Sequence, residues 1–358
     1  MNTSIQFPLQ LNDYLKADFV DLLNSCWGNS ECVKVQLSHS IQGWEEQNFF
    51  VLKLVNQLHE GTVLRSLKPH PFIIPLVNEY FIQNKNSKFT SALLFPFFER
   101  QSIETVISDS RGLRISVVKQ IMWQLVYALE TIHNCGIIHH DIKPSNILVH
   151  DSGNVIIADL GAASVIDQKE STKCYCEQGT PRYQAPEILS KSVSGHDQRC
   201  DIWSLGLLMY FLLTGSHWLA GNPSEDLIKI FTFAHEDPIR QDQLKINLLK
   251  AGATVLEIEL IQNMTRVDAN NRITLKGILG SDYFKNFIPT KPFGKTLSKA
   301  EFVRKYLTVQ VPDTLPSSLK NFQSQNIVNA DSSRPFFLAE SSPYLPIDFD
   351  FKTVFGEE

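Results

Sequence analysis

Two short polar segments combine residue types that can move a proton and hold a phosphate and a metal ion. Residues 139–146 have the sequence His-His-Asp-Ile-Lys-Pro-Ser-Asn, which places a carboxylate (Asp141), an ammonium (Lys143) and an amide (Asn146) within six positions. Asp159 follows thirteen residues after Asn146. A positioned carboxylate accepts protons, an ammonium attracts phosphate, and carboxylate and amide oxygens are ligands for Mg²⁺. The spacing therefore predicts one site for proton, phosphate and metal chemistry.

This pairing resembles the catalytic loop and the metal-binding loop of eukaryotic-type protein kinases, in which H-R-D-x-K-x-x-N precedes D-F-G. The resemblance implies that Asp141 accepts the proton of a substrate hydroxyl and that Lys143 lies against the transferring phosphoryl group. It also implies that Asn146 and Asp159 hold Mg²⁺, with Gly161 as the flexible residue after the acid. The alternative is an ordinary polar turn between two strands.

Three further segments continue the resemblance in the same order, so that it extends over residues 20–287. Residues 179–187 (GTPRYQAPE) are similar to the end of a kinase activation segment, and residues 201–206 (DIWSLG) to the start of the large buried helix of the C-lobe. An arginine at residues 270–274 (NNRIT) resembles the one that pairs with the glutamate of A-P-E. The structural and substrate-docking residues implied are Thr180, Glu187, Asp201 and Arg272.

An apolar run at residues 50–54 carries a single lysine, Lys53, and resembles the V-A-I-K strand of kinases. A lysine in a buried strand is costly unless it is paired, and Glu60 is the candidate partner. The resemblance implies that Lys53 holds the α- and β-phosphates of ATP while Glu60 fixes its rotamer. The alternative is a lysine that extends from the strand to solvent.

The same mapping implies two more sets of contacts. The adenine of ATP would lie among three apolar side chains, those of Val33, Val51 and Leu148. Phe98 would supply the backbone N–H that binds the adenine edge, because Pro96 offers only a carbonyl. A stack through both lobes would contain four side chains, Leu64, Leu76, His139 and Leu160.

The phosphate-covering loop departs from the kinase pattern. Kinases usually show G-x-G-x-x-G-x-V, whereas residues 26–33 are CWGNSECV and keep only Gly28. Glycines let backbone N–H groups approach phosphates closely, and side chains obstruct that approach. Glu31 would also place a negative charge near the phosphates. We therefore expect weak nucleotide binding.

His140 is the second departure, since kinases commonly carry an arginine there that clamps a phosphorylated residue of the activation segment. Histidine is shorter, cannot form the bidentate fork and is only partly charged at neutral pH. We expect His140 to be a loop residue, and activity not to depend on phosphorylation of the activation segment. The hydroxyl residues concerned are Ser164, Ser171, Thr172 and Tyr175.

The elements that position these residues form a β-rich first part and a helical second part. Short β-type runs cover residues 32–37, 49–55, 73–77 and 92–98, and a helical stretch covers 56–67. Helical patterns follow at residues 117–133, 200–214 and 226–234. This order predicts an α+β protein with a two-lobed kinase fold, in which a small β-rich N-lobe precedes a larger, mostly helical C-lobe.

The predicted boundaries are an N-terminal extension at 1–19, the N-lobe at 20–98, the C-lobe at 99–287 and a C-terminal extension at 288–358. The hinge falls at residues 95–100. The C-terminal extension contains prolines together with six aromatic residues from Phe336 to Phe355, more than a free tail should contain. We expect it to pack on the catalytic body or on a regulatory partner.

Composition fits this organisation. A chain of 358 residues exceeds the usual size of a single core, and 43% hydrophobic with 20% charged residues is typical of a globular protein. A net charge of −5 gives no reason to expect nucleic acid as a partner. The longest apolar run, residues 205–213, is too short to span a bilayer.

The cysteine pattern favours a reducing compartment. The six cysteines show neither zinc-type pairs nor a disulfide framework. Cys174 and Cys176 are unusual in being separated by one residue. We interpret them as solvent-exposed free thiols, with a redox or metal role as the alternative. The expected location is intracellular, cytoplasmic or nuclear.

The motifs together predict a protein serine/threonine kinase that uses ATP and Mg²⁺ to phosphorylate a protein substrate. Lys143, two residues after Asp141, and Thr180 resemble the serine/threonine branch. The main alternative is a pseudokinase that acts as a binding or scaffolding module, which the degenerate glycine loop favours. A small-molecule kinase is a weaker alternative, because residues 179–187 form a complete peptide-docking segment.

Overall fold

The computed structural model describes residues 9–11, 15–23, 30–45, 47–81, 91–99, 101–107, 112–166, 173–191, 194–218 and 245–289. Gly28, the predicted helix at 226–234 and nearly all of the C-terminal extension lie outside these residues. Two compact units make up the chain, and the polypeptide passes from the first to the second between Phe97 and Phe98. Residues 59–68 group with the second unit.

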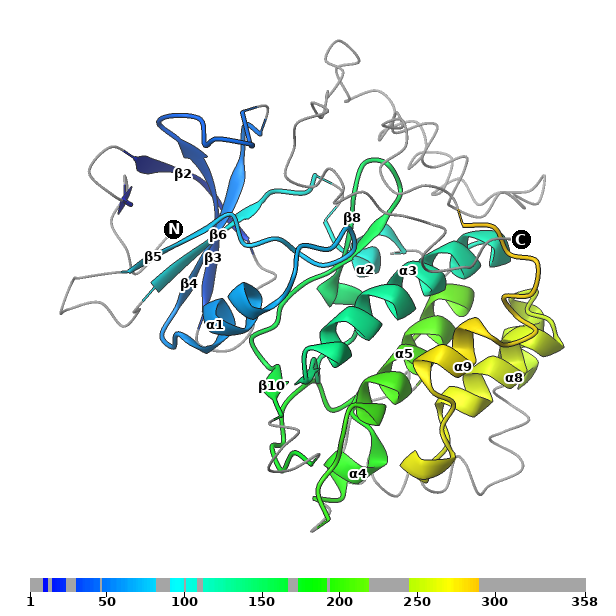
Figure 1. The fold of residues 1–358 in the computed structure, drawn as a ribbon. Coiled ribbons are helices and arrows are strands. Elements are labelled where there is room, and N and C mark those ends of the chain that lie inside the picture. The colour runs from blue at the N-terminus through cyan, green and yellow to red at the C-terminus, as the bar shows by residue number, and fades with distance from the viewer. Residues whose placement is uncertain are drawn as a thin grey trace, which may run out of the picture. The chain divides into compact units, whose positions relative to one another are not determined.

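The first unit is an antiparallel sheet of six strands in the spatial order β1-β2-β3-β4-β6-β5 (Figure 1). Its strands are β1 (Leu9–Gln10), β2 (Lys16–Leu23), β3 (Glu31–Leu37), β4 (Phe50–Val55), β5 (Asn78–Phe81) and β6 (Ser91–Pro96). The predicted runs at 32–37, 49–55 and 92–98 are confirmed as β3, β4 and β6.

Alternation along β3 and β4 builds the core of this sheet. Side chains of a strand point to opposite faces in turn, so residues two apart share a face. Val33 and Val35 of β3 are fully buried, and Phe50, Leu52 and Leu54 of β4 join them in one apolar cluster. The sheet thereby holds Lys53 on β4, opposite Cys32 on β3 and Leu93 on β6.

Two features of the sheet differ from the sequence prediction. The strand expected at residues 73–77 is wrong, since the strand in this part of the chain is β5, which begins at Asn78. Pro75 explains this, because proline has no N–H to donate to a strand ladder. β1 and the start of β2 lie within residues 1–19, where only an extension was expected.

The second unit is mostly helical. Its helices are α1 (His59–Ser66), α2 (Ile103–Val106), α3 (Ile115–Asn134), α4 (Pro186–Leu189), α5 (Arg199–Thr214), α8 (Val255–Met264) and α9 (Leu275–Leu279). The helices predicted at 117–133 and 200–214 are confirmed as α3 and α5, and α1 starts three residues later than predicted. None of the described helices has the length and apolar character that a bilayer crossing requires.

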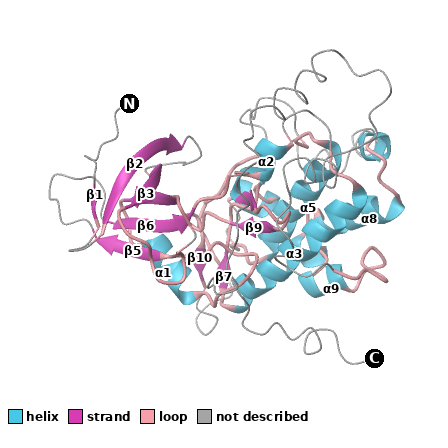
Figure 2. Ribbon diagram, turned by 90° about the horizontal axis from the view of Figure 1, so that it is seen from above, coloured by secondary structure: helices cyan, strands magenta, loops and turns pink. Residues whose placement is uncertain are grey.

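Helix α5 forms the centre of this unit. Every residue from Cys200 to Leu213 is buried, including the charged Asp201. A helix that is apolar all round must be covered on all sides. α3 and α8 contact α5, and α9 contacts α3, as Figure 2 shows from above.

Short paired strands in the second unit position the polar segments singled out above. β8 (Ile147–Val149) pairs with β9 (Val155–Ile157), and this hairpin returns the chain from Asn146 to Asp159. Buried Gln124 of α3 holds the hairpin turn by donating to Asn154 at 2.6 Å and accepting from the Val155 N–H at 2.8 Å. β7 (Ile137–Ile138) pairs with β10 (Ser164–Val165) just outside it. Turns of 3₁₀ helix follow at Pro144–Asn146 (η1) and Ala269–Asn271 (η2).

The bonding state of Cys32 differs from the sequence prediction. Cys32 is disulfide-bonded, which the scattered cysteine spacing did not predict. Among the other described cysteines, Cys135, Cys174, Cys176 and Cys200 carry free thiols.

Candidate active site

The carboxylate of Asp141 is the centre of a dense hydrogen-bond network. Its Oδ1 accepts from the backbone N–H of Thr180 at 2.9 Å and from the Thr180 hydroxyl at 2.6 Å. Its Oδ2 contacts Lys143 Nζ at 2.8 Å and accepts from Asn146 Nδ2 at 2.8 Å. An ionised carboxylate offers about four lone-pair sites, so all of them are engaged. The network holds this side chain, only 8% exposed, in one orientation.

Thr180 connects the activation segment to this loop. Lys143 Nζ donates to the Thr180 hydroxyl at 2.6 Å, which closes a ring of Asp141, Lys143 and Thr180. Gly179 makes the approach possible, because a Cβ there would lie 2.3 Å from the carbonyl oxygen of His140. Its φ of +102° is also one that residues with a side chain rarely adopt.

Asn146 and Asp159 offer the oxygen ligands that Mg²⁺ prefers. Asn146 Nδ2 donates to both the carbonyl oxygen and Oδ2 of Asp141, at 2.9 and 2.8 Å. This orientation leaves the amide oxygen as the Asn146 atom that would accept a metal ion. The carbonyl of Asn146 accepts from the Ala158 N–H at 2.9 Å, which holds the two segments together next to Asp159. The donor set therefore fits Mg²⁺.

Asp201, in the first turn of α5, fixes the backbone that precedes Asp141. It accepts from the N–H groups of His139 and His140, both at 2.9 Å, and from His133 Nε2 at 2.8 Å. Burial alone would raise the pKa of Asp201, but these donors and the nearby histidines lower it to about 2. A carboxylate with all these partners stays ionised although it is fully buried.

His139 is a neutral, structural imidazole. Its Nδ1 accepts from the Asp141 N–H at 3.2 Å, and its Nε2 donates to the carbonyl of Ala158 at 3.2 Å. Burial lowers its pKa, although Asp201 and two other carboxylates oppose this effect. His139 and Leu160 are both fully buried, and Leu160 leads into the exposed Gly161.

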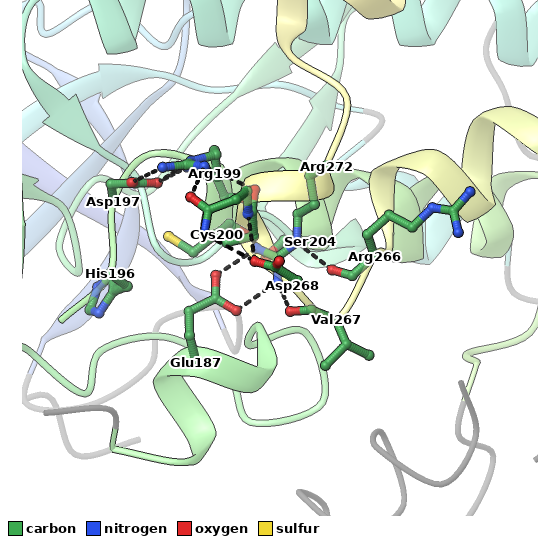
Figure 3. Close-up of polar contacts among 12 residues, drawn as sticks. Glu187, His196, Asp197, Arg199, Cys200, Ser204, Arg266, Val267, Asp268 and Arg272 are labelled. Carbon is green, nitrogen blue, oxygen red and sulfur yellow. Dashed lines mark hydrogen bonds and ion pairs between the residues drawn. The ribbon is translucent and has the colours of Figure 1, made fainter. Parts of the chain in front are cut away.

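Arg272 and Glu187 form a buried, bidentate ion pair (Figure 3). The guanidinium uses its remaining N–H groups on three carbonyl oxygens: Arg266 at 2.7 Å, Val267 at 3.2 Å and Arg199 at 3.0 Å. All five donors of the arginine are thus satisfied. The pair attaches α4, directly after the activation segment, to the loop before α9.

Comparison with known proteins agrees with these motifs, since the protein kinase domain matches residues 32–284. This chain belongs to the protein kinase domain family. The matched range begins in β3 and ends after α9, so it covers parts of both compact units and all of the network around Asp141.

Similar kinases are named from several eukaryotes. The chain is 29% identical over 211 residues to putative ribosomal protein S6 kinase alpha-1 of Caenorhabditis elegans, covering 56% of this chain and 26% of that protein. It is 34% identical over 180 residues to serine/threonine-protein kinase CHK1 of Saccharomyces cerevisiae, covering 48% and 32%. It is 27% identical over 244 residues to the liver/testis phosphorylase b kinase gamma catalytic chain of Rattus norvegicus, covering 66% and 56%. The match thus spans less than two thirds of each of these relatives.

The residues predicted to bind the nucleotide are distributed over both compact units of the chain. Lys53, 9% exposed, lies on β4 with Val51, and Val33 lies on β3. Phe98 and Leu148 belong to the second unit, as does Glu60, which lies in the first turn of α1 and is 5% exposed. Their predicted contacts with ATP remain predictions.

Within the second unit, α1 is attached to the segment that follows Gly161. His59 Nε2 donates to the carbonyl of Ala163 at 2.6 Å. Leu64 of the same helix is buried, as the predicted stack of side chains requires. Leu76, the fourth member of that stack, is half-buried in the first unit.

Sequence analysis missed a group of four side chains next to this site. His140 lies in a loop as expected, but its side chain is buried and lies with His196, Cys174 and Cys176. The interpretation of the two cysteines as solvent-exposed thiols is therefore wrong, since both are half-buried. Two signals in the sequence pointed here: the C-x-C spacing and the histidine in place of the usual arginine.

Within this group, the surroundings of His140 and Cys176 shift the pKa of each of these two side chains. Burial is the largest single effect and favours the neutral form of both Cys176 and His140, but the hydrogen bonds and charges around each of them together outweigh it. The pKa of Cys176 therefore falls below its ordinary value, and that of His140 rises above its own. His140 is accordingly more fully protonated at neutral pH than sequence analysis expected.

Proposed function

We propose that this protein is an active serine/threonine kinase that transfers the γ-phosphoryl group of ATP to a hydroxyl of a protein substrate. The supporting observation is the ring formed by Asp141, Lys143 and Thr180, which holds a carboxylate, an ammonium and a hydroxyl within hydrogen-bond distance. Phosphoryl transfer depends mainly on positioning and electrostatic stabilisation, and this ring supplies both.

Asp141 is the proposed general base. Because all four lone-pair sites of its carboxylate are engaged, an incoming substrate hydroxyl must displace one existing partner. The Thr180 hydroxyl on Oδ1 is the neutral partner that can rotate away while its backbone N–H keeps Oδ1 in place. The substrate hydroxyl would then donate to Oδ1, which receives the proton as the phosphoryl group is transferred.

Lys143 supplies positive charge next to the base. Its side chain is 5% exposed, so the field of its ammonium is screened less by water than that of a surface lysine. It would stabilise the negative charge of the transferring phosphoryl group while it holds Asp141 in orientation. Mg²⁺, when bound by Asn146 and Asp159, would neutralise charge on the phosphate oxygens.

The choice of a serine/threonine substrate rests on the positions of Lys143 and Thr180 and on a relative named as a serine/threonine-protein kinase. Lys53, Glu60, Val33, Val51, Leu148 and Phe98 are the proposed ATP-binding residues. A pseudokinase remains the second candidate, because CWGNSECV lacks two of the three glycines that contact phosphates in kinases.

The test is peptide phosphorylation by the purified full chain with labelled ATP and Mg²⁺. Asp141→Asn should lower turnover by about two to four powers of ten, and Asp159→Asn should be at least as harmful. Asp282→Asn is a matched control, because that side chain is 80% exposed. If the wild type transfers no more phosphate than Asp141→Asn and Asp159→Asn, the pseudokinase is correct.

A further inference from the structure

Four side chains with metal-binding atoms converge beside the catalytic loop. His140, Cys174, Cys176 and His196 each offer one nitrogen or sulfur, and all four atoms lie within 4.8 Å of one another. Both histidines are buried, at 2% and 4% exposure. The four residues come from three segments separated by at least 20 positions, so the spacing along the sequence does not bring them together.

Backbone geometry fixes two of these segments side by side. Cys174 and His196 pair through both of their backbone N–H groups, at 2.7 and 2.9 Å. An ion pair of 2.9 Å between Lys173 and Asp197 continues this pairing on one side. Figure 3 shows His196 on the segment that leads through Asp197 to Arg199.

Gly195 permits the close approach of the two segments. A Cβ at this position would lie 2.8 Å from the carbonyl oxygen of Cys174 and 2.9 Å from the Tyr175 ring. Its φ of +67° lies in the left-handed region, which favours glycine. A glycine directly before His196 is therefore needed for this segment to lie against Cys174 and Tyr175.

His140 is oriented as a metal ligand would be. Its Nδ1 lies 3.1 Å from the carbonyl of Ala162, to which it can donate, and this leaves Nε2 as the atom that faces the cluster. Nε2 lies 2.9 Å from Nε2 of His196 and 3.6 Å from the sulfur of Cys176. Metal-ligating histidines almost always donate their second nitrogen to a carbonyl or carboxylate in this way.

The outer contacts of Cys176 support the same role. The hydroxyl of Ser164 lies 3.4 Å from its sulfur, and the sulfur of Cys174 lies at 3.1 Å. Four ligands around tetrahedral Zn²⁺, with Zn–S of about 2.3 Å and Zn–N of about 2.0 Å, lie roughly 3.3 to 3.8 Å apart. The cluster reaches this arrangement when its close pairs, at 2.9 and 3.1 Å, separate by less than about 1 Å and its most distant atoms, up to 4.8 Å apart, approach by about 1 Å.

We propose that His140, Cys174, Cys176 and His196 bind a structural Zn²⁺ ion that joins the activation segment to the catalytic loop. Two thiolates and two neutral imidazoles are a closed tetrahedral ligand set that suits zinc. The two sulfur charges balance the ion, which favours the site in a half-buried position. Binding releases the protons that the ligand atoms carry.

Such a site gives His140 a function at the position where kinases commonly carry a phosphate-clamping arginine. The metal would tie Cys174 and Cys176 to the residue directly before Asp141, and so order the segment that also presents Thr180. The metal ion would thereby hold the activation segment in place, as a phosphorylated residue of that segment does in kinases that carry the arginine. This functional consequence rests on the proposed kinase activity, whereas zinc binding itself does not.

The binding test uses full-length protein purified under reducing conditions without a metal-affinity tag. Elemental analysis should give about one zinc per chain, as purified or after addition of zinc, and less than about one tenth of that in Cys174→Ser/Cys176→Ser. Cys135→Ser is the matched control and should keep the metal, because Cys135 lies at the end of α3 outside the cluster. Replacement of zinc by Co²⁺ should give the strong visible absorption of a tetrahedral thiolate site.

Thiol reactivity is a second measurement, and it uses the wild type, so that misfolding of a variant cannot be mistaken for loss of the metal site. Removal of zinc from the wild type by a zinc-selective chelator should make two additional thiols reactive, and His140→Arg should show the same reactivity without chelator. If the wild type binds no stoichiometric zinc, or if the double serine variant binds it equally, the proposal is wrong.

An activity measurement separates this inference from the proposed function. With Mg²⁺ in excess, removal of zinc should lower kcat/KM for peptide phosphorylation at least tenfold, and zinc should restore it. Zinc binding without any phosphoryl transfer would overturn the proposed function but leave the metal site intact. If the protein takes up no zinc and its phosphoryl transfer is not increased by added zinc, the metal site alone is overturned, whether the thiols are reduced or joined in a disulfide.

Discussion

The hydroxyl of Thr180 donates to Oδ1 of Asp141 at 2.6 Å while it accepts from Lys143. A single side chain of the activation segment thus contacts both the proposed base and the proposed phosphate-binding lysine. The orientation of the base depends on that segment being in place.

Removal of the Thr180 hydroxyl should therefore slow catalysis without unfolding the protein. When the substrate hydroxyl takes its place on Oδ1, the Thr180 hydroxyl still accepts from Lys143. Hydrogen bonds to charged groups contribute about 1.5–3 kcal/mol, so Thr180→Ala should lower kcat roughly 10- to 100-fold. Thr180→Ser keeps the hydroxyl and should retain most of the activity. Steady-state kinetics of the two variants, with thermal unfolding as the control for folding, would show an error in this assignment if both lose activity equally.

The Glu187–Arg272 pair should be essential for stability. Arg272 is fully buried at its side chain, and Glu187→Gln would leave a buried charge without its counterion. We expect a loss of about 3–5 kcal/mol in the free energy of unfolding. Arg272→Lys should also destabilise, since an ammonium cannot form the fork or reach three carbonyls. Arg266→Lys, with an exposed side chain, is the control in chemical denaturation.

The free energy of unfolding should fall at low pH, because Asp201 becomes protonated there. Its pKa in the folded protein is about 2, below the ordinary value of 3.8. The stabilisation is therefore fully present above pH 4 and is lost as the pH falls toward 2, with a total of roughly 2 kcal/mol. Unfolding free energies measured from pH 6 downward should fall more steeply for the wild type than for Asp201→Asn. Parallel curves would contradict the ion-pair geometry at this residue.

Gly112 should tolerate no side chain. A Cβ there would lie 1.6 Å from the carbonyl oxygen of Leu213 near the end of α5, where the N–H of Leu113 donates to Leu212 at 2.7 Å. Gly112→Ala must displace backbone, and we expect a loss of more than about 2 kcal/mol. Gly280→Ala is the matched control, because its nearest contact would be an ordinary 3.4 Å. Equal melting temperatures for the two variants would refute the packing described here.

Sequence patterns predicted the elements in which periodicity and burial coincide. Val33, Val35, Phe50 and Leu52 alternate on buried strands, and both expected long helices of the described part, α3 and α5, were found. β2 was missed because it lies near the edge of the sheet, where only Ala17 is buried and no alternation of apolar residues develops.

The network around Asp141 was also predictable in part. Asp141, Lys143 and Asn146 lie within six consecutive residues, so their closeness in the sequence already brings them together. The group of His140, Cys174, Cys176 and His196 was not predictable in this way, because Cys174 and His196 meet only through a backbone pairing that the sequence does not specify. The role of His140 depends on those distant neighbours.

The two backbone donors on Asp201 imply slow hydrogen exchange at an irregular part of the chain. The amide protons of His139 and His140 lie in a loop, yet each donates to a fully buried carboxylate. Their release requires α5 to separate from the loop, which amounts to opening the core of the second unit. In deuterium these two amides should exchange as slowly as those in the middle of α5, and far more slowly than those of the exposed Glu177 and Gln178.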